Sequence, residues 1–266
     1  MTVMKTIAIA GCGKLGTIVA RAAARGLLPD YELIGVYSRT PEKARAAADE
    51  LAAAGKECRV AGTFDELLAL RPDFIVEAAS PNALRQWTLP ALSQGTSLVC
   101  LSIGAFADDA FYDEARRTAE AHGSRIYIVS GATGGFDVLQ TAALMGGAEA
   151  EFFNEKGPDA LRGTPVYDDS LQTEARTVFS GTAAEAIRLF PTKVNVTVAA
   201  ARASVGPANL HVAMRSTPGF KGDTQRVEIR NSQVHAVVDV YSATAEIAAW
   251  SVVSTLRNIA SPVVFV

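Results

Sequence analysis

Gly11-Cys12-Gly13-Lys14-Leu15-Gly16 is the stretch of the sequence that decides the fold. It follows a short apolar run at residues 6–10, which is typical of a buried strand, and it precedes an alanine-rich segment with helical spacing at residues 15–25. A G-x-G-x-x-G motif between a strand and a helix is the signature of a dinucleotide-binding βαβ unit. The stretch therefore predicts a nucleotide cofactor and a parallel sheet.

The three glycines of this motif have separate roles. Gly11 permits the tight turn, Gly13 lets a pyrophosphate approach the backbone, and Gly16 lets the helix lie close to the strand. Lys14 and Leu15 open the helix, whose N-terminus carries a partial positive charge that favours phosphate. We expect all five residues to contribute to cofactor binding; a tight turn without a ligand is the alternative.

The first half of the chain continues the same alternation of apolar runs and helical segments. Further strands are expected at residues 32–37, 73–77, 97–101 and 125–129, and helices at residues 41–54, 82–93 and 109–122. Continuous apolar strands separated by helices indicate a parallel sheet covered on both faces. The expected fold class is α/β, with a Rossmann-type doubly wound parallel sheet in the first domain.

The pattern of the sequence changes after Ser130. Glycines cluster at residues 131–135, polar loops are expected around residues 156–170, and strand-like alternation appears at residues 209–215, 226–230 and 234–240. Strands in succession predict a second α+β domain with a mainly antiparallel sheet. The last helical segment, residues 244–256, is expected to pack on the first domain. We therefore assign residues 1–129 and 244–266 to the dinucleotide-binding domain, and residues 130–243 to a substrate and catalytic domain that also mediates oligomerisation.

Composition excludes several classes of protein. The chain has 266 residues, of which 49% are hydrophobic and 20% charged, so it is not disordered. The formal charge of −3 and a pI near 5.7 argue against a nucleic-acid partner. No apolar run reaches the roughly 18 residues of a membrane span. Three cysteines, far apart and odd in number, predict no disulfide framework and no metal site. A cytoplasmic protein that acts on a small molecule is expected.

The end of the second expected strand indicates which cofactor binds. An NAD-specific site places Asp or Glu there to bind the ribose hydroxyls, and this chain has neither. Ser38, Arg39 and Thr40 instead offer two hydroxyls and a guanidinium, which suit a 2′-phosphate. NADP is therefore preferred over NAD; a solvated Arg39 at the start of a helix is the alternative.

Several segments beyond the glycine motif point to one family. They are Glu77-Ala78-Ala79-Ser80-Pro81, Ser102–Asp108 (SIGAFAD), Ser130–Asp137 (SGATGGFD), Phe190–Val196 (FPTKVNV) and Trp250–Leu256 (WSVVSTL). In these segments, which span nearly the whole chain, the sequence resembles L-aspartate dehydrogenases. That resemblance implies NAD(P)-dependent interconversion of aspartate with iminosuccinate, or with oxaloacetate plus ammonia. It also implies an anionic amino or keto acid as substrate, and a homodimer.

The resemblance places Ala132 and Asn195 at the nicotinamide end of the cofactor. Ala79, Ser80 and Ala105 follow expected parallel strands, whose carboxyl ends line the crevice in which dinucleotides bind. These five residues complete the expected cofactor site. A turn or capping role for Asn195 and ordinary packing for Ala132 are the alternatives.

Two departures from the family pattern affect the substrate end. The family carries a catalytic histidine in an Asn-x-His segment, and Asn209-Leu210-His211 matches it superficially. Counting from Asn195 instead places Gln225 at the histidine position. Glutamine can donate and accept hydrogen bonds but cannot act as a general base. The candidate catalytic residues are therefore Gln225, Asn195 and His211, with a sheet-face role as the alternative for His211.

The second departure is the segment Tyr241–Ala245, which retains only Thr244 of the family's Asn-Pro-Lys-Thr-Ser stretch. It puts aspartate itself in doubt, so a reductase of another imine or a carbonyl, or a non-catalytic cofactor-binding protein, stays open. Among the other polar residues, we expect His122 to mark the C-terminal end of a helix and His235 to lie on a sheet face. We expect Lys156 to be a solvated loop lysine rather than a residue that binds an anion.

Overall fold

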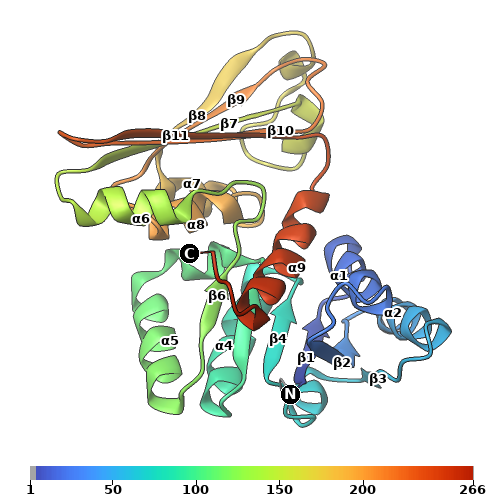
Figure 1. Ribbon diagram of the computed structural model, residues 1–266. Helices are drawn as coiled ribbons and strands as arrows, with labels where there is room; N and C mark the ends of the chain where they lie inside the picture. The colour runs from blue at the N-terminus through green and yellow to red at the C-terminus, as the bar shows by residue number, and fades with distance from the viewer. Residues whose placement is uncertain (1–3, 266) are drawn as a thin grey trace. The chain divides into compact units, whose positions relative to one another are not determined.

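A computed structural model describes residues 4–265 (Figure 1). The chain divides into two compact units: the first comprises the residues up to Val129 together with those from Ala248 onward, and the second is Ser130–Ile247. None of the helices formed by the described residues is long and apolar enough to cross a membrane.

The first unit is built on a six-stranded sheet in which every pairing is parallel. Its strands are β1 (Lys5–Ala10), β2 (Tyr31–Tyr37), β3 (Arg59–Ala61), β4 (Phe74–Glu77), β5 (Ser97–Cys100) and β6 (Ile126–Ile128). The strand order is β3-β2-β1-β4-β5-β6, so successive connections leave in opposite directions from β1 and β4. This reversal is the point at which open α/β sheets bind their ligands.

Helices cover both faces of this sheet. They are α1 (Lys14–Ala24), α2 (Pro41–Ala53), α3 (Phe64–Leu68), α4 (Pro81–Ser93), α5 (Asp109–His122) and α9 (Glu246–Ala260). One apolar core joins α1, α2 and α9 to the sheet, and the buried hydroxyl of Tyr31 donates to the carbonyl of Leu256 at 2.7 Å. No described residue of α4 or α5 belongs to that core; α4 packs against α5 and β5 instead. The doubly wound fold expected from the sequence is confirmed.

The helices of the first unit begin and end where the sequence supplies caps. Ser80 accepts a hydrogen bond from the backbone of Ala83 and is followed by Pro81 at the first helical position of α4. Asp108 caps α5 in the same way, and Gly123 ends it in the left-handed conformation at φ +65°. The expectation that His122 marks the C-terminal end of a helix is therefore correct.

The second unit has a five-stranded sheet of order β11-β10-β7-β9-β8 (Figure 1). Its strands are β7 (Glu149–Lys156), β8 (Arg176–Thr182), β9 (His211–Ser216), β10 (Asp223–Arg230) and β11 (His235–Ser242). Only the β7–β9 pairing is parallel, so the sheet is mainly antiparallel, as expected. Three helices supply the rest of the core: α6 (Phe136–Leu144), α7 (Ala183–Leu189) and α8 (Asn195–Arg202).

Several elements were not anticipated from the sequence: β3, α3, β7, β8 and the three helices of the second unit. The polar stretch expected as loop from residue 156 onward begins one residue too early, because Lys156 is the last residue of β7. After it, the chain forms only single 3-10 turns at Pro158–Leu161 and Asp169–Gln172 before β8.

Candidate active site

The glycine-rich turn between β1 and α1 is held against the loop that follows β4. A Cβ atom on Gly11, whose φ is +109°, would lie 2.6 Å from the carbonyl of Ala78, and one on Gly16 would lie 1.9 Å from the carbonyl oxygen of Gly11. Neither position accepts a side chain without moving backbone. Gly13 has nothing within 4 Å of the place its Cβ would occupy, so a ligand can approach the backbone there.

A cavity of about 450 Å³ opens beside this turn. The loop after β2 lines it with Ser38, Arg39 and Thr40, and Lys43 follows from the first turn of α2. The lining also includes Gly11, Gly13, Ala79 and Ser80, so the structure brings together seven of the residues expected at the cofactor. No carboxylate is among the lining residues of this cavity. Two cations without a facing anion favour a phosphate.

An aromatic wall bounds the same cavity. Trp87 of α4 and Tyr37 of β2 both line it, with ring centroids 5.8 Å apart at an interplanar angle of 73°. Phe64 stacks on Trp87 at 4.7 Å and 6°. These contacts hold the indole ring in place at the cavity, where it can contact the planar base of a nucleotide.

A buried carboxylate organises the loops at the carboxyl ends of β4 and β5. Glu77 is fully buried, and its Oε1 accepts from the backbone N–H groups of Ala79 at 2.8 Å and Ser80 at 3.1 Å. Its Oε2 accepts from the N–H of Ser102 at 2.9 Å. Burial raises the pKa of Glu77, and these N–H groups oppose the rise because they stabilise the ionised form. Glu77 therefore fixes the backbone of Ala79 and Ser80, which line the cavity.

Six other expected cofactor residues do not line the cavity: Gly16, Ala132, Asn195, Lys14, Leu15 and Ala105. Lys14 is exposed at the start of α1, Leu15 packs partly against the core, and Ala105 is buried in the 3-10 turn Ile103–Ala107. The hydroxyl of Ser80, which does line it, is engaged in capping α4. Its contribution to the cavity comes through the loop it stabilises.

The glycine cluster of the second unit is used mainly for packing. Gly135, at φ +68°, lies under β11: a Cβ there would come within 2.5 Å of a methyl group of Val238. Gly131, at φ +63°, would meet Val196 at 3.4 Å, and only Gly134 faces open space. Ala132 is half-buried in this loop, and the hydroxyl of Thr133 is buried without a partner among the described residues.

Gln225 lies on the helix-covered face of the second sheet. It is 6% exposed and pairs across β10–β7 with Asn154, whose amide donates to Asp223 at 3.2 Å and to the carbonyl of Thr224 at 2.9 Å. One pair further along, Lys156 stands opposite Asp223, and their Nζ and Oδ1 atoms are 3.3 Å apart. The expected catalytic position is therefore part of a buried polar group.

The expectation of a solvated Lys156 is wrong. The residue is 4% exposed, because the register of β7 places it on the same face as Phe152 and Asn154. Burial lowers the pKa of Lys156, and the repulsion of Lys193 lowers it further, while Asp223 opposes both effects. Since Lys193 acts on Lys156, the segment that leads into Asn195 at the start of α8 lies near this polar group.

Comparison with known proteins identifies the family. Residues 11–129 match the NAD-binding domain of homoserine dehydrogenase, and residues 137–259 match the C-terminal domain of aspartate dehydrogenase. The L-aspartate dehydrogenase of Methanocella arvoryzae is 31% identical over 97% of this chain and 98% of its own length. L-aspartate dehydrogenase 1 of Bordetella pertussis is 37% identical over 80% of this chain and 77% of its own.

The chain belongs to the L-aspartate dehydrogenase family. The crystal structure of aspartate dehydrogenase from Thermotoga maritima has the same fold, with a TM-score of 0.78 and 23% identity over 98% of this chain and 99% of that one. Membership in the aspartate dehydrogenase family confirms the predicted class of enzyme, a nicotinamide-dependent oxidoreductase.

The two histidines of the second sheet lie on the face opposite Gln225. His211 opens β9 with its ring exposed, and its Nε2 lies 3.2 Å from the hydroxyl of Ser180. His235 is exposed on β11 and bonds to Glu228 at 2.8 Å. His211 pairs with Glu151 of β7, whereas Gln225 pairs with Asn154 of the same strand, so the two positions are also three residues apart along β7. His211 and Gln225 cannot act together on one substrate atom, so this aspartate dehydrogenase relative has no histidine beside the expected position.

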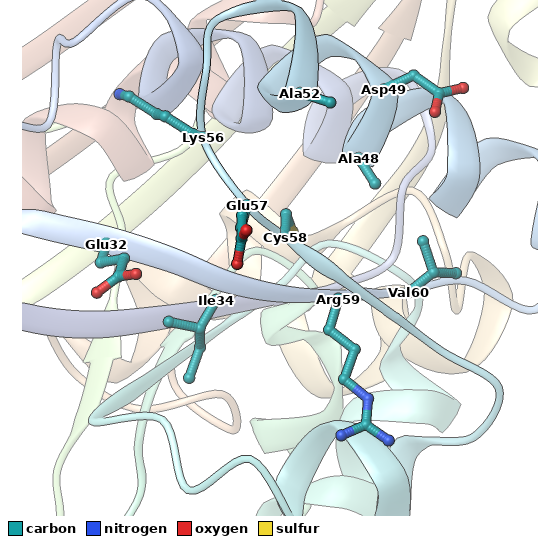
Figure 2. Close-up of a pocket in the computed structure, with 10 residues that line it drawn as sticks. All are labelled: Glu32, Ile34, Ala48, Asp49, Ala52, Lys56, Glu57, Cys58, Arg59 and Val60. Atoms are coloured by element: carbon teal, nitrogen blue, oxygen red, sulfur yellow. The ribbon is translucent and has the colours of Figure 1, made fainter.

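A second cavity, of about 670 Å³, lies elsewhere in the first unit (Figure 2). Its walls come from the first half of β2, from α2 and from the chain leading into β3, with Glu32, Asp49 and Glu57 among the lining residues. Burial raises the pKa of the nearby Cys58 thiol to about 12, so it is not a nucleophile at neutral pH. The cavity is away from the carboxyl ends of the strands, where ligands bind in such sheets.

Several residues at the site were not expected from the sequence: Lys43 and Trp87 of the cavity, Glu77, and Asp223. An acidic residue at the end of an apolar strand, such as Glu77, is a signal that hydrogen-bond donors must satisfy its carboxylate. Asp223 precedes Gln225 by two residues, and this spacing places both on one face of a strand.

Proposed function

We propose that the protein catalyses NADP-dependent hydride transfer at the Cα of a small, anionic amino acid or imino acid of the aspartate type. Family membership supports the class of reaction. The observation that supports NADP is the lining of the cofactor cavity, which contains Arg39 and Lys43 and no carboxylate.

The preference for NADP follows from charge. A 2′-phosphate on the adenosine ribose would meet the guanidinium of Arg39, the ammonium of Lys43 and the hydroxyls of Ser38 and Thr40. NAD has hydroxyls at that place and is bound best by a carboxylate at the end of β2, which this chain lacks. NADPH therefore gains charge-assisted contacts that NADH does not.

Arg39→Ala tests this choice. A hydrogen bond to a charged group is worth about 1.5–3 kcal/mol, so the affinity for NADPH should fall roughly 10- to 150-fold while the affinity for NADH stays unchanged. Arg45→Ala is the matched control, because Arg45 is an exposed arginine of α2 that does not line the cavity. Fluorescence titration gives both dissociation constants. Equal affinities of the unmodified protein for the two cofactors would contradict the assignment.

At the substrate end, we propose that Ala132 and Asn195 lie near the nicotinamide. The bound cofactor supplies or accepts the hydride, so the chain has to hold the substrate carbon, bind its carboxylate and manage one proton. The amides of Asn195 and Gln225 can orient a carboxylate, an imine or a water molecule by hydrogen bonds. Neither amide can take up the proton.

A reductase of a different imine or of a carbonyl is the second candidate, and Gln225 is the observation that favours it. The two candidates differ in their need for ammonia. NADPH oxidation with oxaloacetate that depends on added ammonium supports the aspartate-type reaction, whereas ammonium-independent oxidation with a keto acid supports a carbonyl reductase. The absence of substrate-dependent NADPH oxidation would indicate a cofactor-binding protein without catalysis.

We also propose that the protein is a homodimer, as the family resemblance implies. Light scattering coupled to size-exclusion chromatography measures this directly. A mass near the 28.0 kDa of one chain would contradict it.

A further inference from the structure

One end of the helix-covered sheet face in the second unit is polar across four neighbouring strands. The pairing registers place Ser242, Asp223, Lys156 and Ser216 in one row, on β11, β10, β7 and β9. Two residues further along the strands, a second row contains Gln225 and Asn154, and beyond that row the face is apolar. An apolar face that ends in a row of buried polar side chains needs polar partners there.

Two members of this row have no hydrogen-bond partner in the part of the chain that the structure describes. The hydroxyl oxygens of Ser216, which is 0% exposed, and Ser242, which is 7% exposed, accept and donate no hydrogen bond among the described residues. Leaving a buried polar group unpaired costs about 1–3 kcal/mol. Since Ser216 stands directly beside Lys156 and Ser242 directly beside Asp223, the row has unused hydrogen-bonding capacity on both sides of the Lys156–Asp223 pair.

The Lys156 ammonium is within reach of the position expected for the catalytic histidine. In an antiparallel pair, diagonal neighbours on one face lie about 7–8 Å apart, with their Cβ atoms somewhat closer, and Lys156 and Gln225 are such neighbours. A lysine side chain spans most of that distance. No histidine of the described residues lies on this face of the sheet, because His211 and His235 are exposed on the other.

We propose that Lys156 is the catalytic residue that exchanges a proton with the substrate nitrogen, and that Asp223 positions its ammonium. This role rests on the proposed function. It gives the proton transfer to the substrate nitrogen to a lysine, because the amide of Gln225 cannot take up or release that proton.

The chemistry of this step is balanced by one proton and one hydride. In the reductive direction, the imine carbon gains a hydride from the bound cofactor, the electron pair of the C=N bond moves to nitrogen, and nitrogen takes a proton from the Lys156 ammonium. The products are the amine, the oxidised cofactor and a neutral Lys156, which regains a proton from water. In the oxidative direction, neutral Lys156 accepts the proton that the amine loses.

The charges around Lys156 suit a group that changes protonation. Asp223 on β10 and Lys193, in the segment between α7 and α8, are the charged groups that act on it. The Lys193 ammonium donates to the carbonyl of Ala160 at 2.6 Å, and Glu155 and Arg215 occupy the opposite face of the sheet. Burial and Lys193 lower the pKa of Lys156 and Asp223 raises it, so removal of Asp223 should lower it further.

The decisive experiment is a pH profile of kcat/KM for the unmodified enzyme and for Asp223→Asn, measured as NADP reduction by the amino acid between pH 6 and pH 10. The alkaline rise should move to lower pH by about one unit in the variant, the lower end of the range for loss of an opposite charge, because Asp223 is partly exposed. The pKa of the substrate amine does not depend on the variant. A profile that does not move would overturn the role of Lys156.

Two substitutions of Lys156 separate proton exchange from charge. Lys156→Arg keeps the positive charge but holds its proton, and Lys156→Met removes both; each should lower kcat about 10²- to 10⁴-fold with an unchanged NADPH dissociation constant. Lys221→Met, at an exposed lysine that follows β9, is the control and should leave kcat unchanged. Full activity of Lys156→Arg would overturn the proposal.

A readout that does not depend on turnover comes from NMR of protein labelled at the lysine Cε. The Lys156 signal, identified by its loss in Lys156→Met, should titrate below the ordinary value of 10.5, and lower still in Asp223→Asn. Titration at or above the ordinary value contradicts the proposal. An unmodified protein that turns over no amino or imino acid removes the proposed function together with this role. Turnover without the pH shift removes only the role of Lys156.

Discussion

Glu77→Gln replaces the buried carboxylate that holds the loops after β4 and β5. The carboxylate accepts three backbone N–H bonds, two at Oε1 and one at Oε2. An amide has one oxygen, and its NH₂ group cannot accept. In its better orientation the glutamine keeps the bonds from Ala79 and Ser80 and turns its NH₂ group toward the N–H of Ser102.

The smallest loss is therefore one hydrogen bond to a buried backbone donor. Such a loss costs about 1–3 kcal/mol of unfolding free energy. In a protein of this size that corresponds to a decrease in Tm of about 2–12 °C. The affinity for NADPH should fall as well, because the displaced loop carries Ala79 and Ser80 of the cofactor cavity.

Thermal unfolding and NADPH titration of Glu77→Gln measure both effects. Glu66→Gln is the matched control: its carboxylate is exposed and accepts from the backbone of Gly62 at 2.8 Å, so its loss should be smaller. If Glu77→Gln unfolds at the same temperature as the unmodified protein and binds NADPH equally well, the reasoning is wrong.

The pH dependence of this difference has a defined sign. Burial raises the pKa of Glu77 above its ordinary value of 4.5 in the folded protein. Ionising Glu77 therefore costs more in the folded protein than in the unfolded one, and the unfolding free energy of the unmodified protein decreases as the pH rises from 4.5 through the folded-state value. Glutamine does not titrate, so the stability difference between the two proteins should shrink as the pH rises above about 4.5.

Two further substitutions test the second unit and the attachment of the last helix. Asn195→Ala should raise the activation free energy obtained from kcat by more than it lowers the unfolding free energy, because a positioning hydrogen bond is lost. Steady-state kinetics and urea unfolding measure the two free energies. Changes of equal size in both would indicate a structural role. Tyr31→Phe removes the hydrogen bond from the Tyr31 hydroxyl to the carbonyl of Leu256 and should cost about 0.5–1.5 kcal/mol in urea unfolding, with the NADPH affinity unchanged. An unchanged midpoint would show that this bond does not hold α9.

The first unit could be read from its sequence because its strands are buried on both sides and appear as continuous apolar runs. β1 and β4 are of this kind. β3 was missed, since Arg59 and Val60 are exposed on an edge strand of three residues and give no such run. In the second unit, the alternation of β7 is broken where Asn154 and Lys156 take inward positions that normally hold apolar residues.

The cavity beside the glycine motif was more predictable than the polar row of the second sheet for a physical reason. The glycine motif encodes backbone contacts within a few residues of itself, so its geometry follows from local sequence. The polar row containing Lys156, Asp223 and Ser216 is formed by pairing of strands that are distant in the chain. Without the register, a lysine followed by Gly157 and Pro158 is read as the start of a loop.

The contact between the glycine turn and the loop after β4 also bears on how this protein can be altered. Gly11 and Gly16 are confined by backbone atoms, so that part of the cofactor site tolerates almost no change. Arg39 and Thr40, by contrast, are exposed, and they reach the same cavity from the loop after β2. The turn that would hold the dinucleotide and the segment that we propose selects NADP over NAD are thus separate stretches of chain. Evolution or an engineer can exchange the second by substituting side chains alone, at little risk to the fold.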